Sequence, residues 1–262
     1  MNGLARRVAR GLAAVAAITA LAVPAGARPV DRIAVAVADA AHRSADNVKL
    51  DASRKPADIL HFFQVRRGMK VADLFGSNHY WSELLSPVVG PAGTVTVWEP
   101  TQFLDDKSTA EFAAFAATHP NVHLITSPFE APVLPQAAYD FMLINLNYHD
   151  VYWTSEKYGV VKMAPAAWLK TVSASVRRGG IVGVVDHVGP AADATRDTRA
   201  IVDQEHRIDP AIVKADFERA GFRLVGSSNL LANPADDHKL LVFDPAIRGK
   251  TDRFVYRFRK VR

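Results

Sequence analysis

The fold is decided by the stretch MKVADLFGSNHYWSELLSPVVGP, residues 69–91, in which an apolar run leads directly into a helix pattern. The run at 69–74 follows the turn at 66–68 and predicts a buried strand. The helix pattern has an apolar stripe at i, i+4 and i+8 that consists of Tyr80, Trp81, Leu84, Leu85 and Val88. Gly90-Pro91 ends it as a helix C-terminus should. A strand that leads at once into a helix is the first half of a βαβ unit.

Outward from this unit, strand-like and helix-like segments alternate along the chain. Further strands are expected at 94–98, 122–125, 139–145, 181–185, 222–225 and 254–259. Helices are expected from a capping box at Ser108 to Pro120, from Pro165 through Val176 to Gly179-Gly180, and from Asp209-Pro210 to Gly221. The alternation predicts an α/β fold, a doubly wound parallel sheet with helices on both faces. No helix is expected between the last two strands.

The N-terminus has the pattern of an export signal. Arg6, Arg7 and Arg10 precede an apolar run at 11–23, and small residues at 25–27 fit cleavage after Ala27. The run is about 13 residues long, short of the roughly 20 that a membrane-spanning helix needs, so a cleaved signal is favoured over an anchor. The arginine pair also leaves a twin-arginine signal open. We predict a signal peptide at 1–27 and a periplasmic or secreted mature protein without stable membrane insertion.

Composition limits the domain organisation, the partners and the chemistry that can be expected of the remaining chain. Residues 28–51 predict a partly helical lead-in, and residues 52–262 predict one main domain. Three of the 32 basic residues lie in the signal, which leaves 29 against 27 acidic ones, a net charge of +2. That charge is too small to indicate a nucleic-acid partner. The absence of cysteine excludes disulfides, thiolate metal sites and cysteine nucleophiles. No sequence feature assigns an oligomeric state.

Polar residues follow the predicted strands where each one ends. Asp73 starts the loop after the first strand, Glu99 follows the second, and Ser127 follows the third. Asn145 begins the loop after the fourth strand, and Asp186-His187 follows the fifth. In open α/β sheets the ligand lies outside the carboxyl ends of the strands, where the strand order reverses. A carboxylate after the second strand suits the two hydroxyls of a ribose.

The series of local motifs resembles that of one family. It comprises Arg54-Lys55-Pro56, Asn147-Tyr148-His149-Asp150, Val185-Asp186-His187, His206-Arg207-Ile208-Asp209-Pro210, the run 233–238 and the run 243–252. In this order, across about residues 44–262, they resemble the class I S-adenosylmethionine-dependent methyltransferases, within a bacterial exported group described as predicted methyltransferases.

The resemblance implies a Rossmann-like sheet of seven strands, mostly parallel with an antiparallel last strand. It also implies S-adenosylmethionine as cofactor and a small-molecule methyl acceptor near the fourth-strand loop. Carried over by position, the cofactor-binding residues are Asp73, Phe75, Gly76, Ser77, Asn78, Glu99, Ser127 and Asn145. Among these, Glu99 would hold the ribose and Ser127 would contact the adenine.

The loop after the first strand departs from the family pattern. The family form is Asp-x-Gly-x-Gly-x-Gly, whose glycines permit positive φ and close approach of the backbone to the cofactor. Phe75, Ser77 and His79 occupy those three positions here, and Gly76 is out of register. Side chains at these positions are expected to crowd the cofactor or replace it. The alternative function is therefore a catalytically inactive, periplasmic binding protein with the methyltransferase fold.

The candidate catalytic residues are Tyr148, His149, Asp150 and His187. A histidine beside a carboxylate suits proton removal from an acceptor, and His149 or Tyr148 would deprotonate an oxygen or nitrogen. Asp186-His187 should lie close to this loop, because the carboxyl ends of the fourth and fifth strands share one edge. The alternative is that these groups only bond to their neighbours and cap backbone amides.

Two further patterns are weaker. Together His149, Asp150, Asp186, His187 and His238 contain enough donors for a divalent metal. No tight motif such as His-x-x-x-His enforces a site, so no metal site is predicted, and a metal-assisted hydrolase or lyase ranks third. Residues 236–238 lie between the last two strands and are expected in a solvated loop, with a lid over the pocket as the alternative.

Overall fold

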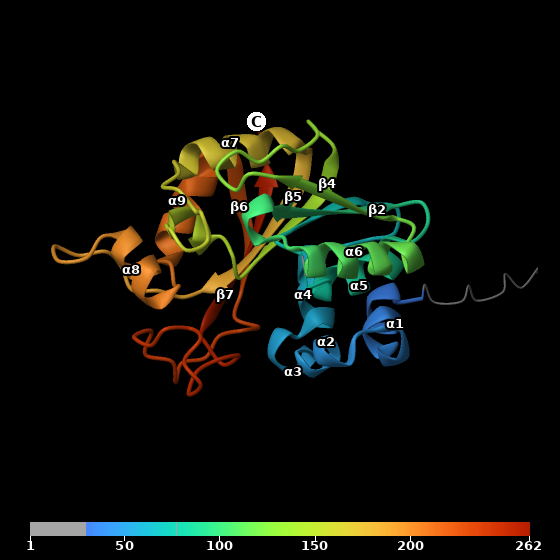
Figure 1. Ribbon diagram of the computed structural model, residues 1–262, viewed down its shortest axis with the longest axis horizontal. Helices are drawn as coiled ribbons and strands as arrows, with labels where there is room; N and C mark the ends of the chain where they lie inside the picture. Colours follow the sequence, from blue (N-terminus) through green and yellow to red (C-terminus); the bar gives the residue numbers. More distant parts are fainter. Residues whose placement is uncertain (1–29, 77) are drawn as a thin grey trace, which may run out of the picture. The chain divides into compact units, whose positions relative to one another are not determined.

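A seven-stranded sheet in the order β3-β2-β1-β4-β5-β7-β6 organises the chain (Figure 1). The structure is a computed structural model that describes residues 30–76 and 78–262. The strands are β1 (Lys70–Leu74), β2 (Thr94–Pro100), β3 (Val122–Ser127), β4 (Tyr139–Asn145), β5 (Val176–His187), β6 (Phe222–Ser228) and β7 (Arg253–Lys260).

Strand directions follow the predicted plan. β1 to β5 pair in parallel, while β7 is antiparallel to both β5 and β6. The prediction of a seven-stranded, mostly parallel sheet with an antiparallel last strand is confirmed. The chain winds outward from β1 to β3 and then returns to place β4 on the other side of β1. The strand order reverses there, which makes the carboxyl ends of β1 and β4 the expected place for a ligand.

Twelve helical segments are found among the described residues. They are α1 (Arg32–Ala38), η1 (Ala40–His42), α2 (Ala45–Lys49), α3 (Asp51–Arg54), α4 (Pro56–Phe63), α5 (Tyr80–Val89), η2 (Thr101–Phe103), α6 (Asp106–Thr118), η3 (His149–Tyr152), α7 (Pro165–Ser175), α8 (Thr198–Glu205) and α9 (Pro210–Arg219). Asp209 caps α9 by accepting from Ala211 N at 2.8 Å, as predicted.

Helices cover both faces of the sheet (Figure 1). Successive side chains of a strand point to opposite faces. Val71 of β1 therefore packs with the face covered by α1, α4, α5 and α6, whereas Ala72 and Leu74 pack with the face covered by α7 and α9. The two hydrophobic clusters confirm the doubly wound arrangement. Packing in these two clusters fixes the position of the sheet edge from which the polar loops extend.

Two predicted helix ends were wrong. α6 begins one turn earlier than the predicted capping box, because Asp105 accepts from Ser108 N at 2.7 Å and Ser108 Oγ accepts from Asp105 N at 2.9 Å. α7 ends at Ser175, since Val176 pairs with Tyr139 and starts β5. A β-branched residue fits a pleated sheet well, and the pairing overrides the helical spacing. Gly179-Gly180 therefore lies within β5.

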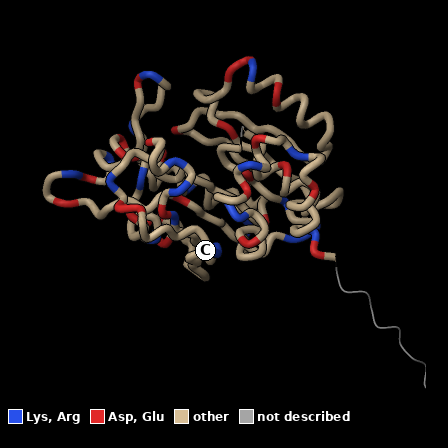
Figure 2. Tube along the Cα trace, turned by 90° about the horizontal axis from the view of Figure 1, so that it is seen from below, with Lys and Arg blue, Asp and Glu red and all other residues tan. Residues whose placement is uncertain are grey.

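Residues Asp31–Arg262 form one compact unit. The predicted signal at 1–27 lies outside the described residues and stays a prediction, as does the boundary at 51. Within the described part, no helix is both long enough and apolar enough to cross a bilayer. Basic and acidic residues are interspersed along the trace (Figure 2).

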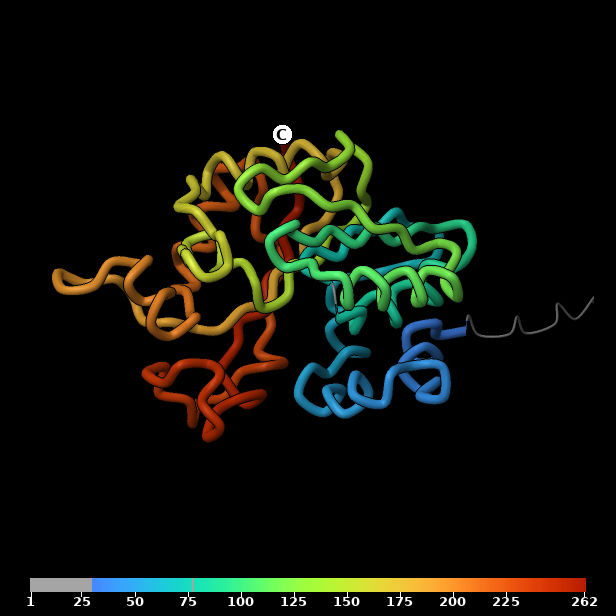
Figure 3. Tube along the Cα trace, viewed as in Figure 1, coloured from blue at the N-terminus to red at the C-terminus, as the bar shows by residue number. Residues whose placement is uncertain are grey.

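The long connection between β6 and β7, residues 229–252, is built from turns (Figure 3). Asp236 in this insert is buried against Arg207, and its carboxylate accepts from Nη1 at 2.8 Å and Nη2 at 3.1 Å. The expectation of a solvated loop was wrong for Asp236, because a buried charge pair ties the insert to the end of α8. Asp237 beside it is exposed, as expected.

Candidate functional site

A cavity of about 540 Å³ lies beside the loops that follow β4 and β5. We call it the histidine cavity. It is lined by Phe103, Leu146, Asn147, His149, Asp150, Trp153, Tyr158, His187, His206, Val242 and Phe243. Its volume lies within the range of about 300–1,000 Å³ that small-molecule sites occupy. Aromatic walls with a few convergent polar groups are typical of such sites.

His149 is fixed by the strand end beside it. Its Nδ1 lies 2.8 Å from Asp186 Oδ1, and its backbone N donates to Asp186 Oδ2 at 2.8 Å. Asp186 is fully buried and also accepts from His187 N. The predicted approach of the fourth-strand and fifth-strand loops is therefore confirmed. With Nδ1 engaged, Nε2 is the ring nitrogen of His149 that remains for other contacts.

Asp150 and His206 complete the polar side of this cavity. Asp150 Oδ1 lies 3.3 Å from His149 Nε2 and 3.7 Å from His206 Nδ1. The other oxygen of Asp150 accepts from Asn147 Nδ2 at 3.0 Å. His206 follows α8 in the left-handed region, at φ 51°. A residue with a Cβ is strained there, and such strain is often found at functional sites.

The charges of this group follow from burial and from the carboxylates. Burial acts to lower the pKa of His149, but the carboxylates of Asp186 and Asp150 outweigh it and raise the pKa to about 9. His187 lacks such a partner, and burial together with the charge of His149 lowers its pKa well below the usual value. Its Nδ1 lies 2.7 Å from Thr251 Oγ1. His149 is thus a cation at neutral pH, whereas His187 is a neutral imidazole.

A second, smaller cavity of about 90 Å³ lies at the loop after β1. We call it the loop cavity. It is lined by Arg54, Asp73, Leu74, Phe75, Gly76, Asn78, Trp81, Asn145, Leu146 and Asn147. Leu146 and Asn147 line both cavities, so the loop after β4 separates the two.

The loop after β1 keeps the backbone of a glycine-rich turn. Phe75 has φ 62° and His79 has φ 59°, both in the left-handed region that favours glycine. The Phe75 ring packs against Trp98 and Phe129 at centroid distances of 5.1 and 5.4 Å. The His79 ring stacks on Phe115 of α6 at 4.6 Å. Both side chains thus pack against neighbouring rings. Ser77 lies outside the described residues.

Gly76 allows a close approach that no other residue would permit. A Cβ at Gly76 would lie 2.8 Å from Asp73 Oδ2 and 3.1 Å from Val97 Cγ1. Asp73 is itself buried and accepts from Ser82 Oγ at 2.8 Å. Burial raises the pKa of Asp73 to about 7, even though Ser82 and Arg54 act to lower it. Gly76 and the buried carboxyl group of Asp73 therefore pack closely together at the base of this loop.

Arg54, at the end of α3, brings an unused donor to the loop cavity. Its guanidinium lies over the Tyr80 ring at 4.2 Å. Its Nη1 is buried and finds no hydrogen-bond partner among the described residues. Buried donors are almost always paired, so an unpaired one beside a polar cavity indicates a place for an acceptor such as a carboxylate.

The other predicted site residues lie apart from the two cavities. Glu99 is buried at the end of β2, 3% exposed, and lines neither of them. Ser127 Oγ accepts from Trp98 Nε1 at 2.8 Å and from Val133 N at 2.9 Å. The Tyr148 hydroxyl donates to Asp216 of α9 at 2.7 Å, and Tyr148 lines neither cavity.

The structure therefore brings the predicted residues together in two groups. His149, Asp150 and His187 share the histidine cavity, and the loop cavity collects Asp73, Phe75, Gly76, Asn78 and Asn145. Sequence reasoning missed His206, Arg54 and Phe243 as site residues. The sequence feature that could have identified His206 and Arg54 was their position within the motifs quoted above. Phe243 is brought in by the long insert, which no local pattern reveals.

A further cavity of about 410 Å³ lies between α7, α9 and the end of β7. Lys170, Asp216, Arg219, Lys260 and Arg262 are among its lining residues. Because β7 runs antiparallel, its end lies at the amino edge of the parallel strands. Ligands of open α/β sheets bind at the opposite edge, so the histidine cavity is the better candidate.

Comparisons with known proteins identify the fold. No protein-family model matches the sequence, and no curated protein sequence does. Solved structures do match. A SAM-dependent methyltransferase from Aquifex aeolicus superposes with a TM-score of 0.55 at 16% identity, over 82% of this chain and 93% of that one. The 1,6-didemethyltoxoflavin-N1-methyltransferase from Burkholderia thailandensis, solved with 1,6-didemethyltoxoflavin and S-adenosylhomocysteine, gives 0.52 at 17%, over 91% and 94%.

The chain thus has the fold of the class I SAM-dependent methyltransferases. The same fold hosts other chemistry, because the [4+2]-cyclase SpnF also superposes, with a TM-score of 0.53 at 13% identity, over 80% of this chain and 81% of that one. Function must therefore be argued from the site.

The residues around the loop cavity fit one end of S-adenosylmethionine. The unpaired Nη1 of Arg54 suits the carboxylate of the methionine portion, and the loop backbone already has the left-handed conformation. The space is the obstacle, since about 90 Å³ has room for the amino-acid end and not for a nucleoside. The whole cofactor therefore needs more space than the loop cavity has in this structure.

Proposed function

We propose that the chain is an S-adenosylmethionine-dependent methyltransferase whose acceptor is a small molecule bound in the histidine cavity. One observation carries the proposal. The cavity with the unpaired arginine and the aromatic cavity with the histidines lie on either side of Leu146 and Asn147. A donor and an acceptor bound in them would meet across the loop after β4. Reaction between two bound molecules depends mainly on such positioning.

The acceptor would be planar and largely apolar, with one oxygen or nitrogen that reacts. Phe103, Trp153, Tyr158 and Phe243 supply aromatic walls, and Asp150 and the histidines supply the polar contacts.

The chain's own residues would act as follows. Arg54 would hold the carboxylate of the cofactor, which when bound supplies an electrophilic methyl group. His149, protonated by virtue of its two carboxylate neighbours, would donate to the acceptor and orient it. His187, neutral and with Nδ1 engaged by Thr251, would accept a hydrogen bond from the acceptor. The proton that the acceptor loses would pass to solvent as the product leaves. The aromatic walls would exclude water.

Calorimetry with S-adenosylhomocysteine tests the cofactor. We expect binding no tighter than high micromolar, because moving the loop reduces the measured affinity by the fraction of chains that are open. The triple variant Phe75→Gly, Ser77→Gly, His79→Gly is expected to bind about tenfold tighter, because bare backbone can approach the ligand. Thermal denaturation would verify that each variant is folded.

Arg54→Gln serves as the test of the carboxylate contact. In the glycine background it should weaken binding about tenfold, the worth of one charge-assisted hydrogen bond. Arg66→Gln is the matched control, since Arg66 is exposed in the turn before β1. Absence of binding by both the wild type and the glycine variant would instead favour the alternative, a non-catalytic binding protein that uses only the histidine cavity. The small volume of the loop cavity favours that alternative.

We also propose that the mature protein acts in the periplasm or outside the cell. The arginines and the apolar run within 1–27 support this. N-terminal sequencing of protein from the periplasmic fraction should find Arg28 as the first residue. An intact N-terminus on protein recovered from the cytoplasm would refute export.

A further inference from the structure

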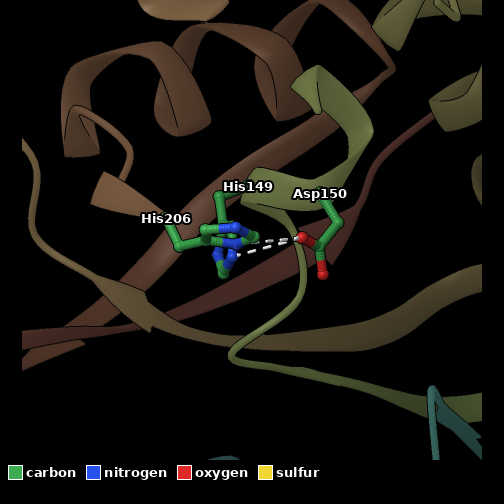
Figure 4. A group of neighbouring side chains, drawn as sticks. All are labelled: His149, Asp150 and His206. Atoms are coloured by element: carbon green, nitrogen blue, oxygen red, sulfur yellow. Dashed lines mark ion pairs between the residues drawn. The ribbon is translucent and has the colours of Figure 1, made fainter. Parts of the chain in front are cut away.

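Three side chains that can bind a metal ion converge on one wall of the histidine cavity. They are His149, Asp150 and His206, shown in Figure 4. One ligand atom from each lies within 4.8 Å of the other two. His149 and Asp150 are buried and His206 is half-buried, so these are not surface groups that happen to be near one another.

The spacing of the ligand atoms suits a common metal ion. Asp150 Oδ1 lies 3.3 Å from His149 Nε2 and 3.7 Å from His206 Nδ1. Two ligands that each lie about 2.1 Å from an ion are about 3.0–3.4 Å apart at octahedral or tetrahedral angles. Both distances from Asp150 Oδ1 are therefore within a few tenths of an ångström of the spacing that an ion requires, and the two histidine ligand atoms lie within 4.8 Å of each other.

Neighbouring groups hold two of the three ligands in a suitable orientation. Asp186 engages Nδ1 of His149, which directs Nε2 toward Asp150. Asn147 donates to Oδ2 of Asp150 and leaves Oδ1 for the histidines. A histidine ligand whose other nitrogen donates to a carboxylate is the usual arrangement around protein-bound metals.

The ligand set selects the kind of ion. Two imidazoles and one carboxylate suit Zn²⁺, Fe²⁺, Co²⁺ or Ni²⁺, whereas Mg²⁺ and Ca²⁺ prefer oxygen ligands alone. Three protein ligands also leave positions open for water or for a bound molecule, as in catalytic sites. The three residues line a cavity of about 540 Å³, so those positions face a space that a small molecule can enter.

We propose that His149, Asp150 and His206 bind one divalent transition-metal ion in the histidine cavity, with Asp186 as the positioning residue. The ion would bind His149 Nε2 in place of its proton, so in the metal-bound form the ion, and not the protonated imidazole, would hold the acceptor. In the open positions it would hold an oxygen or nitrogen of the cavity's ligand and lower the pKa of that group. The proposal does not depend on methyl transfer, and it differs from the sequence analysis, which predicted no metal site.

Metal titration tests the site directly. Protein purified without a histidine tag and stripped with a chelator is titrated with Co²⁺, whose visible absorption reports coordination. We expect saturation at one ion per chain, displacement by Zn²⁺, and no displacement by Mg²⁺ at the same concentration. Lack of saturable binding, or displacement by Mg²⁺, would overturn the proposal.

Ligand variants place the ion. His206→Ala and Asp150→Asn should each weaken Co²⁺ binding by roughly tenfold or more. Asp150→Asn keeps the volume of the buried side chain nearly unchanged, and His206→Ala truncates a side chain that is only half-buried. His61→Ala is the matched control, since His61 forms an exposed histidine–carboxylate pair with Asp31 at 3.1 Å. Thermal denaturation of metal-free samples confirms folding. Unchanged Co²⁺ affinity in the two ligand variants would assign the ion elsewhere and refute this site.

Discussion

Asp236→Ala is expected to lower the free energy of unfolding by about 3–5 kcal/mol, since the change leaves a buried guanidinium without its counter-charge. Arg207 is fully buried, and its Nη1 and Nη2 donate to the two oxygens of Asp236. The carboxylate also accepts from His238 N at 3.0 Å and Asp252 N at 2.7 Å. In the alanine variant these two backbone N–H groups, like the guanidinium of Arg207, would have no acceptor.

The same change should loosen the wall of the histidine cavity. Arg207 also donates to Leu240 O at 2.9 Å, and the insert carries Val242 and Phe243 into the cavity lining. Urea unfolding, followed by tryptophan fluorescence, measures the loss of stability.

Asp237→Ala is the matched control for this prediction. Asp237 is the next residue along the insert, and it is exposed and paired with Lys239 at 3.4 Å. Surface pairs contribute about 0–1 kcal/mol, so this variant should unfold within about 0.5 kcal/mol of the wild type. Equal effects of the two alanine variants would show that the buried pair with Arg207 does not hold the insert.

The sheet and the meeting of its loops were predictable because both depend on local signals and on a general rule. Residues 139–145 contain an apolar run at 141–144 and form β4 at the predicted bounds. Parallel strands end at the same edge of the sheet, which is why His149 and Asp186 were expected to lie close together. His149 Nδ1 lies 2.8 Å from Asp186 Oδ1. Strand pattern plus topology was sufficient for this part of the site.

The remaining site residues depend on long-range packing that no local pattern encodes. His206 reaches Asp150 only because α8 ends in a left-handed residue, 56 positions further along the chain. Asp236 was expected in solvent because acidic residues between strands usually are. Its partner Arg207 is 29 residues away and is buried only once the insert has folded back. An aspartate that caps a helix and one that pairs with a buried arginine cannot be told apart from the local sequence.

The turn after β1 shows how side chains are accommodated at positions where the family pattern has glycines. The rings of Phe75 and His79 pack against Trp98 and Phe115 while the backbone stays left-handed. That these side chains crowd or replace the cofactor stays a prediction, which the glycine variant tests. Each such residue costs roughly 1–2 kcal/mol relative to glycine. Ring packing on both sides offsets that strain. The loop cavity has a volume of about 90 Å³, which is less than a nucleoside needs.

Asp73→Asn is expected to stabilise the protein at pH 8 by about 2–4 kcal/mol and to leave its stability at pH 4 nearly unchanged. Burial raises the pKa of Asp73 to about 7 in the folded state, from its ordinary value of 3.8. Between these two pKa values the unfolded chain has lost the proton and the folded chain keeps it. The wild type should therefore lose stability as the pH rises from about 4 to 7 and then level off. Asparagine is neutral throughout, has nearly the same shape, and can still accept from Ser82 Oγ.

Urea unfolding of both proteins at pH 4, 6 and 8 measures this difference, because other titrating groups cancel in the comparison. Asp46→Asn is the control, since Asp46 is exposed and paired only with Lys49. Its difference from the wild type should not grow with pH above 5. Parallel pH profiles for the wild type and Asp73→Asn would mean that Asp73 is ionised in the folded state. The nearby Arg54, whose Nη1 was assigned to a ligand carboxylate, would then be neutralised by Asp73 instead, and the argument for a carboxylate in the loop cavity would fail.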